Sequence, residues 1–191
     1  MEADWELELG GGAPVIDACW AGLVDLRVSP QCVVEIEETR ALPGLAEALV
    51  RMNAPGSPVW TAKCDVWVVE EPVDPFELDA APEDAAHAVA CYIDLLPRSP
   101  QPWNTPEGAA EACRALAARL RAVALQACRV DLVVRQARIA PEGYGLGISA
   151  YGTACGADEC AARARLGAAV AAFANTLAPS APPAASGSPL Q

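Results

Sequence analysis

The sequence predicts a two-layer α+β domain in which an antiparallel sheet, built from β-hairpins, carries helices on one face. Three observations predict this class. From residue 43 onward the apolar pattern switches between helical and strand periods in the order helix, hairpin, helix, hairpin, helix. The hydrophobic content is 53% with only 5% aromatic residues, so small side chains should pack between closely spaced elements. A chain of 191 residues fits within one domain.

The N-terminal segment 1–38 is predicted to add strands to this plan. Residues 5–9 alternate apolar and charged side chains, which is typical of a half-buried strand, and three consecutive glycines then end it. Residues 15–28 fit a helix nearly as well as a strand, and we favour a strand over 21–28. A further strand is predicted over 31–37.

Helices are predicted at about 43–52, 106–126 and 158–177. Thr39 is expected to cap the first of them. Thr105 is followed by proline and glutamate, which are the preferred residues for a helix start. The second and third helices each carry one apolar stripe toward the core. The stripes are Ala109, Cys113, Leu116, Leu120 and Val123, and Leu166, Val170, Phe173 and Leu177.

Two hairpins alternate with these helices. The first pairs strands at 62–70 and 86–96, and the second pairs strands at 129–139 and 144–154. This order of elements, over residues 43–177, resembles that of small type III secretion chaperones, which are acidic as well. The resemblance depends on no motif, so it implies an architecture and no function.

The domain is predicted to end near residue 177. Residues 178–191 are rich in proline, alanine and serine, and they are expected to form a disordered tail because such a segment buries too little surface to offset its ordering entropy. We therefore expect one domain over 1–177 with a tail behind it.

The formal net charge of −12 argues against nucleic acid or an anionic membrane as a partner. The charge is uneven, because residues 1–100 contain 19 acidic and 5 basic residues, whereas residues 101–191 contain 6 and 8. A second copy of the chain could balance this asymmetry, as could contacts within the chain. We find no signal peptide and no apolar run long enough to span a bilayer, and we expect a cytoplasmic protein.

The eight cysteines show a repeated spacing. Cys64 and Cys91 are 27 residues apart, and so are Cys128 and Cys155. A hairpin that turns after Pro141 would place Cys128 opposite Cys155, within reach of a disulfide, and Cys160 could join them from the start of the last helix. Three interpretations stay open: buried packing thiols, which we favour, a redox-active or metal-binding cluster, and a structural disulfide.

The spacing of the cysteines and of the sole histidine does not favour a metal site or a catalytic site. Cys155 and Cys160 lack a second close pair of ligands, and His87 and Cys91 lie too far apart along one strand to share an ion. His87 is also the sole histidine, and nothing near it suggests a catalytic arrangement. We therefore predict no metal, no cofactor and no catalytic residue, and we lean toward a protein that is not an enzyme.

The loop 70–84 contains seven carboxylates. It lacks the aspartate spacing and the central glycine of a calcium loop, so a solvated loop is the simplest interpretation. Alternatively it could dock a basic partner. The candidate docking residues are Asp74, Phe76, Glu77 and Asp79, with Phe76 as an apolar anchor.

Glycines at 143, 145 and 147 do not form a phosphate loop, because they open a strand rather than a helix. Small residues at 145, 147 and 149 share one face of that strand, which indicates close packing against a helix of this domain or against a second protomer.

We expect a non-enzymatic protein-interaction or chaperone-like module that presents a sheet face or the acidic loop to a protein partner. We expect this module to form a homodimer. One alternative is a thiol-dependent redox or metal-thiolate protein that uses the paired cysteines. Another is a small carboxylate-based enzyme.

Overall fold

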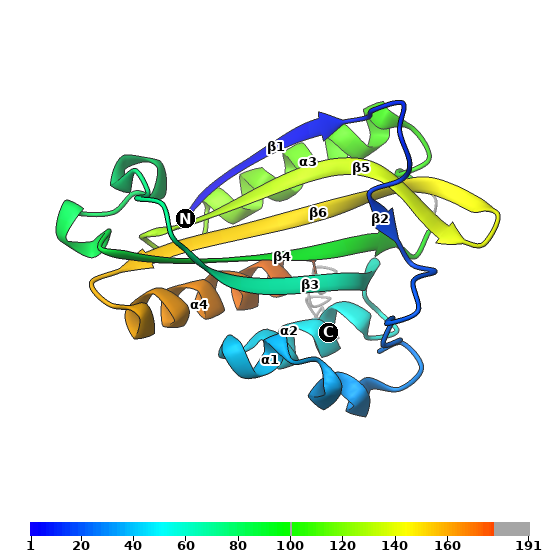
Figure 1. The fold of residues 1–191 in the computed structure, drawn as a ribbon. Coiled ribbons are helices and arrows are strands. Elements are labelled where there is room, and N and C mark those ends of the chain that lie inside the picture. Colours follow the sequence, from blue (N-terminus) through cyan, green and yellow to red (C-terminus); the bar gives the residue numbers. More distant parts are fainter. Residues whose placement is uncertain (100, 178–191) are drawn as a thin grey trace, which may run out of the picture.

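A six-stranded mixed sheet forms one layer of the molecule and helices form the other (Figure 1). The computed structural model of the chain describes residues 1–99 and 101–177, so the tail predicted at 178–191 lies outside the described residues. The predicted two-layer α+β class is confirmed.

The strands are β1 (Glu2–Glu8), β2 (Ile16–Asp17), β3 (Val59–Val69), β4 (His87–Pro97), β5 (Cys128–Ala140) and β6 (Gly143–Gly156). Their order in the sheet is β1-β5-β6-β4-β3, and the short β2 also pairs with β5. Both predicted hairpin segments are strands, and β3, β4, β6 and β5 pair antiparallel. However, β1 and β2 run parallel to β5, so the prediction of a wholly antiparallel sheet is wrong. Alternation reveals the buried face of a strand and not its direction of pairing.

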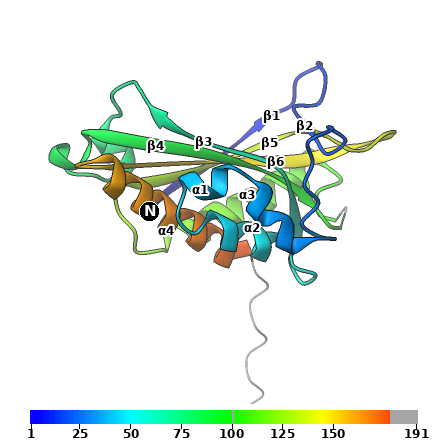
Figure 2. The ribbon, with the colours of Figure 1, turned by 60° about the horizontal axis from the view of Figure 1, so that its bottom comes forward.

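The α-helices lie on one face of the sheet, as Figure 2 shows. They are α1 (Glu38–Ala41), α2 (Leu45–Asn53), α3 (Pro106–Arg121) and α4 (Glu159–Leu177), and short 3-10 helices form at η1 (Pro30–Glu35), η2 (Pro75–Leu78) and η3 (Pro82–Asp84). The three predicted helices correspond to α2, α3 and α4. Helix α3 ends earlier than predicted because Val123 N donates to Leu120 O and closes the last turn. Among the described helices, none has both the length and the apolar character needed to cross a membrane.

The two helix starts behave differently. The Thr105 hydroxyl oxygen accepts a hydrogen bond from Gly108 N at 3.1 Å, which confirms the predicted cap of α3. Thr39 does not cap α2. It lies within α1 and donates to Ile36 O at 2.7 Å, while α2 begins after Gly44, whose φ of 82° is readily adopted only by glycine.

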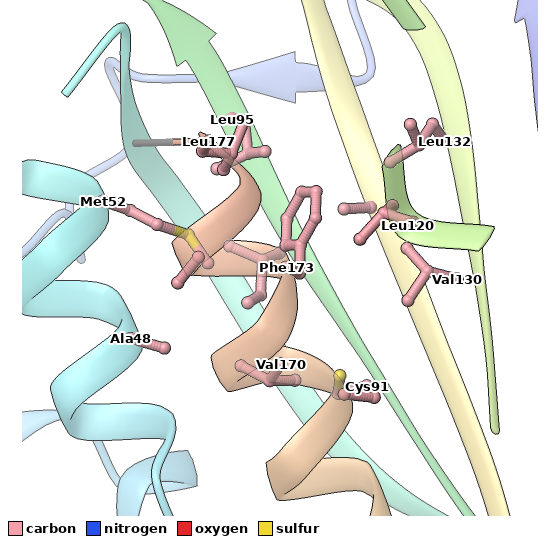
Figure 3. Close-up of a cluster of buried hydrophobic side chains, with 14 of the residues drawn as sticks. Ala48, Met52, Cys91, Leu95, Leu120, Val130, Leu132, Val170, Phe173 and Leu177 are labelled. Carbon is pink, nitrogen blue, oxygen red and sulfur yellow. The ribbon is translucent and has the colours of Figure 1, made fainter. Parts of the chain in front are cut away.

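The main core lies between the helices and the sheet. Figure 3 shows Phe173 of α4 beside Leu120 of α3, with Met52 of α2 and Leu132 of β5 on either side. All of these side chains are buried. Both predicted helix stripes face this core and are buried, apart from the partly buried Val123.

The strands predicted over 21–28 and 31–37 are wrong. The second segment forms η1, because Val33 and Ile36 are three residues apart, the period of a 3-10 turn, and both pack against the main core. In the first segment, the Asp25 carboxylate accepts hydrogen bonds from the backbone and the guanidinium of Arg27. This local bonding favours a turn over a strand.

Candidate functional site

The face of the sheet away from the helices is covered at its two ends. At one end, β2 and its flanks contribute to a cluster of Ile16, Ala18, Trp60, Ala62, Leu96 and Ala137. At the other end, the loop between β3 and β4 contributes to a cluster of Leu78, Ala88, Ala127 and Cys155. Between the two clusters lies a band of the sheet that we call the open strip.

Gly147 of β6 lies under the first of these covers. A Cβ atom at this position would come within 2.8 Å of the Ile16 Cδ1 atom. The close packing expected on this face is therefore provided by β2 at Gly147, while at Gly145 the nearest side chain is Ile139 of β5, and neither contact comes from a helix. The reason is that this side of β6 faces away from the helical layer.

Three aromatic rings cross the open strip from β3 through β4 to β6. Tyr92 is the register partner of Tyr151, and their ring centroids lie 6.0 Å apart. The Trp67 ring lies 6.4 Å from that of Tyr92, and Trp67 is 39% exposed. Both ring pairs are tilted, which is an arrangement that aromatic side chains favour. We call Trp67, Tyr92 and Tyr151 the aromatic stripe.

Arg135 of β5 extends the aromatic stripe. Its Nη1 atom donates to the Tyr151 hydroxyl at 2.7 Å, and its guanidinium carbon lies 5.5 Å from the centre of that ring. Its Nε atom donates to Glu8 Oε2 at 2.8 Å. The guanidinium is therefore held in place by a hydroxyl and a carboxylate.

A hollow opens beside the aromatic stripe. In the next row of the sheet, Trp67 pairs with Ala90, Ala90 with Thr153, and Thr153 with Arg129. Ala90 and Thr153 are small, so the floor between Trp67 and Arg129 is low. Residues 71–74, 77 and 78 of the loop also line this space, which measures about 540 Å³. We call it the sheet-face hollow.

The sheet-face hollow is surrounded by excess negative charge. The Arg129 Nε atom donates to both carboxylate oxygens of Asp131 at 2.8 Å, and this bonding raises the pKa of Arg129. The lining carboxylates Glu71, Asp74 and Glu77 form no ion pair with another described residue. Arg129 is thus paired with Asp131, and the three loop carboxylates form no ion pair of their own among the described residues, although Glu77 lies within the electrostatic field of Arg129.

The predicted docking residues lie at this hollow and around the end of the sheet. Asp74 caps η2 by accepting from Phe76 N at 2.9 Å, and it lines the hollow together with Glu77. Phe76 is 89% exposed, and with Glu77 and Asp79 it lines a second open depression, which also includes Arg129 and Arg165. The structure therefore brings the four residues together on one edge of the open strip.

On the other side of the aromatic stripe lies a buried polar pair. Asp94 of β4 and Ser149 of β6 are register partners and are 5% and 1% exposed. The Ser149 hydroxyl donates to Asp94 Oδ1 at 2.6 Å. Burial raises the pKa of the Asp94 carboxyl, whereas the Ser149 hydrogen bond and the cations Lys63 and Arg135 act in the opposite direction.

The hollow, the aromatic stripe and the Asp94–Ser149 pair occupy successive rows of the sheet. No known protein-family model, curated protein or solved structure matches this chain. In these rows, aromatic rings, paired cations and carboxylates without an ion pair lie side by side on neighbouring strands.

Sequence-based reasoning missed the aromatic stripe and the Asp94–Ser149 pair. The available signal was strand alternation in β4, since Tyr92 and Asp94 occupy the phase opposite to the buried apolar residues of that strand. Trp67 had no such signal, because its neighbours in β3 are not buried. The sheet-face hollow had no such signal, because it depends on which small residues become neighbours across strands.

The candidate thiol cluster is divided over the molecule. Cys64 and Cys91 both face the main core from neighbouring strands, but neither is the register partner of the other, because Cys64 pairs with Ile93 and Cys91 with Val66. Burial raises the pKa of each thiol to about 12. Such thiols carry almost no thiolate at neutral pH, so nucleophilic and redox chemistry is disfavoured there.

The expected opposition of Cys128 and Cys155 is wrong. A β-bulge at Ile139 shifts the register by one residue, so Cys128 pairs with Ala154. Cys128 faces the helices, whereas Cys155 lies in the cluster on the other face of the sheet. Cys160 is exposed near the start of α4, and all eight cysteines are free thiols.

His87 begins β4 and is exposed. Within residues 1–99 and 101–177, no three His, Cys, Asp or Glu side chains gather closely enough to hold a metal ion.

Proposed function

We propose that this chain is a protein-interaction module that binds a polypeptide partner on the open strip of its sheet. The observation that carries the proposal is the aromatic stripe, which is partly exposed on a sheet face that the helices do not cover. Tryptophan, tyrosine and arginine are the residue types that contribute most to protein interfaces. All three residue types occur together on the open strip. The Tyr92 ring contacts those of Trp67 and Tyr151, and the Arg135 guanidinium lies over Tyr151.

The strip is suited to binding because its groups are already ordered. The rings stand on strands within one sheet, and Arg135 is fixed by Tyr151 and Glu8. Little side-chain entropy is therefore lost on association. An extended segment could lie along the part of β3 that carries Trp67, because β3 is an edge strand.

The first half of the β3 edge is less open to such a partner. The Asn53 side chain exchanges hydrogen bonds with Thr61, and Trp20 Nε1 donates to Ala62 O. The chain thus protects one half of its edge strand, as proteins commonly do against unwanted pairing. Neither Asn53 nor Trp20 bonds to the half of β3 that carries Trp67. This difference supports a binding role for the open strip.

A peptide-display selection on the full-length chain tests the proposal. We expect peptides to be enriched on the unmodified chain and to bind Trp67→Ala about tenfold or more weakly, which is the loss typical of a central interface residue. Tyr144→Ala is the matched control, because Tyr144 is 70% exposed outside the stripe and should be dispensable. Circular dichroism confirms that each variant is folded.

The opposite results would contradict the proposal. If no peptide is enriched, or if the enriched peptides bind Trp67→Ala as tightly as the unmodified chain, the open strip is not a polypeptide-binding surface. The homodimer stays a prediction, and a monomer by native mass spectrometry across micromolar concentrations would show that it is wrong.

A further inference from the structure

We propose that the partner of the open strip places a lysine or arginine side chain in the sheet-face hollow. The cationic head group would lie between the Trp67 ring and the carboxylates of Glu71, Asp74 and Glu77. This inference depends on the proposed function and names the chemistry that the partner carries.

The shape of the hollow admits a long side chain. Its floor is made by Ala90 and Thr153, and its walls are Trp67 on β3 and the loop between β3 and β4. The volume is about 540 Å³, and the space is open to the surface of the strip. Because Trp67 belongs both to the hollow and to the aromatic stripe, a segment that crosses the stripe passes directly over the opening.

The charges that line the sheet-face hollow favour a cationic partner side chain. Arg129, the basic residue in the lining, is matched by the bidentate contact with Asp131. The three loop carboxylates have no such countercharge among the described residues. An acidic partner side chain would add repulsion at this position, whereas a basic one would complete ion pairs.

The Trp67 ring provides a second attraction. Elsewhere this chain pairs tryptophans with its own cations: Arg27 lies over Trp60, Lys63 over Trp20 and Arg114 over Trp5. Over the part of the chain that the structure describes, no cation of the chain itself stacks on Trp67. Tryptophan is the strongest of the aromatic residues in attracting a cation, so its face at the wall of an acidic hollow favours the same head group.

Fluorescence anisotropy with labelled peptides tests this inference on the full-length chain. The probes are hexa-arginine amide, its neutral counterpart hexa-citrulline amide, and hexa-glutamate amide, at low and at physiological salt. We expect binding of hexa-arginine and no measurable binding of the other two. Binding should weaken as salt rises, because screening reduces the attraction between charges.

Two triple variants separate the hollow from the general negative charge of the chain. Glu71→Gln/Asp74→Asn/Glu77→Gln removes the hollow carboxylates, and Asn at 74 can still cap η2. Glu37→Gln/Glu107→Gln/Glu142→Gln removes three exposed carboxylates elsewhere. Hexa-arginine should bind the first variant about tenfold more weakly and the second within about twofold of the unmodified chain. Trp67→Ala should also weaken binding with no change in charge.

Each other outcome has a distinct meaning. Equal losses in the two triple variants, or full affinity in Trp67→Ala, overturn the cation hollow. If display selects peptides without lysine or arginine whose binding needs Trp67, the interaction module stands and the cation inference is wrong. If hexa-arginine requires the hollow carboxylates but display selects no peptide, the hollow binds a cationic group and the proposed binding of a specific polypeptide along the open strip is wrong.

Discussion

The Ser149 hydroxyl donates a 2.6 Å hydrogen bond to the Asp94 carboxylate, between two side chains that are almost fully removed from solvent. The pair lies beside the aromatic stripe, at the centre of the sheet. A buried carboxyl depends on its hydrogen bonds, because it has lost its contacts with water. The stability of this part of the sheet should therefore respond to changes in either partner.

Ser149→Ala should lower the free energy of unfolding by about 1 to 3 kcal/mol, which is the cost of leaving a buried acceptor without its donor. Urea denaturation measures the change. In the Asp94→Asn/Ser149→Ala double variant the loss should be smaller, since no ionisable group is then left unpaired. Equal losses in the single and double variants would contradict the coupling.

Asp94→Asn tests the direction of the pKa shift. The pKa of the Asp94 carboxyl is raised by burial, so the folded state favours the protonated form. This group favours folding most below its ordinary pKa of 3.8, and that contribution is lost as pH rises through the higher folded value. Asp94→Asn should therefore stabilise the chain relative to the unmodified protein at pH 7 and have little effect at pH 3.

Urea unfolding at both pH values checks this expectation. Destabilisation by Asp94→Asn at pH 7 would mean that Lys63 and Arg135 outweigh burial and hold the carboxyl ionised. Glu142→Gln, which replaces an exposed acid at the tip of the second hairpin, is the matched control for removing one carboxylate.

Thiol labelling distinguishes buried packing cysteines from reactive ones. At pH 8 a chromogenic disulfide reagent should modify exposed Cys160 quickly, and half-buried Cys19 and Cys32 more slowly. Cys91 and Cys113 should stay unmodified until the chain unfolds, because they are buried and burial raises their pKa to about 12. Half-buried Cys64 should react more slowly than Cys19 and Cys32, because its pKa is also raised to about 12.

Cys160→Ser should remove the fast phase of that reaction. Peptide mass mapping identifies which sulfur atoms were labelled. Rapid modification of Cys64 or Cys91 in the folded chain would favour the thiol-dependent alternative over an interaction module.

The parts of the fold that sequence could predict are those in which local periodicity and tertiary burial agree. The stripe of α4 and the cap at Thr105 are examples, since each depends on spacing within one element. The segment 31–37 failed because Val34 and Ile36 fit the two-residue period of a strand, whereas the pair that packs against the core is Val33 and Ile36, which are three residues apart.

The candidate site was harder to predict because it depends on register. One extra residue at Ile139 separates Cys128 from Cys155, and no spacing rule anticipates a bulge. The sheet-face hollow likewise requires Ala90 to be beside Thr153, with the loop folded back over both. The charges of Asp74 and Glu77 were visible in the sequence, but the aromatic wall beside them was not.

The last prediction concerns the packing of α4 against the start of α2. A Cβ atom at Gly167 would lie 2.3 Å from the carbonyl oxygen of Pro43, so Gly167→Ala forces the backbone to move. Such overpacking costs about 1 to 3 kcal/mol, whereas alanine in a helix returns about 1 kcal/mol. The net effect should be a loss of about 1 kcal/mol of unfolding free energy, measured by urea denaturation.

Gly56→Ala is the matched control, because no atom lies within 4 Å of a Cβ at that position. It should change stability by less than about 0.5 kcal/mol. If Gly167→Ala is instead stabilising, helix propensity has outweighed the contact and α4 is not held against Pro43. A loss of stability in Gly167→Ala would show that the helical layer is packed closely enough for one added methyl group to be destabilising. Such close packing is expected for a core of small side chains.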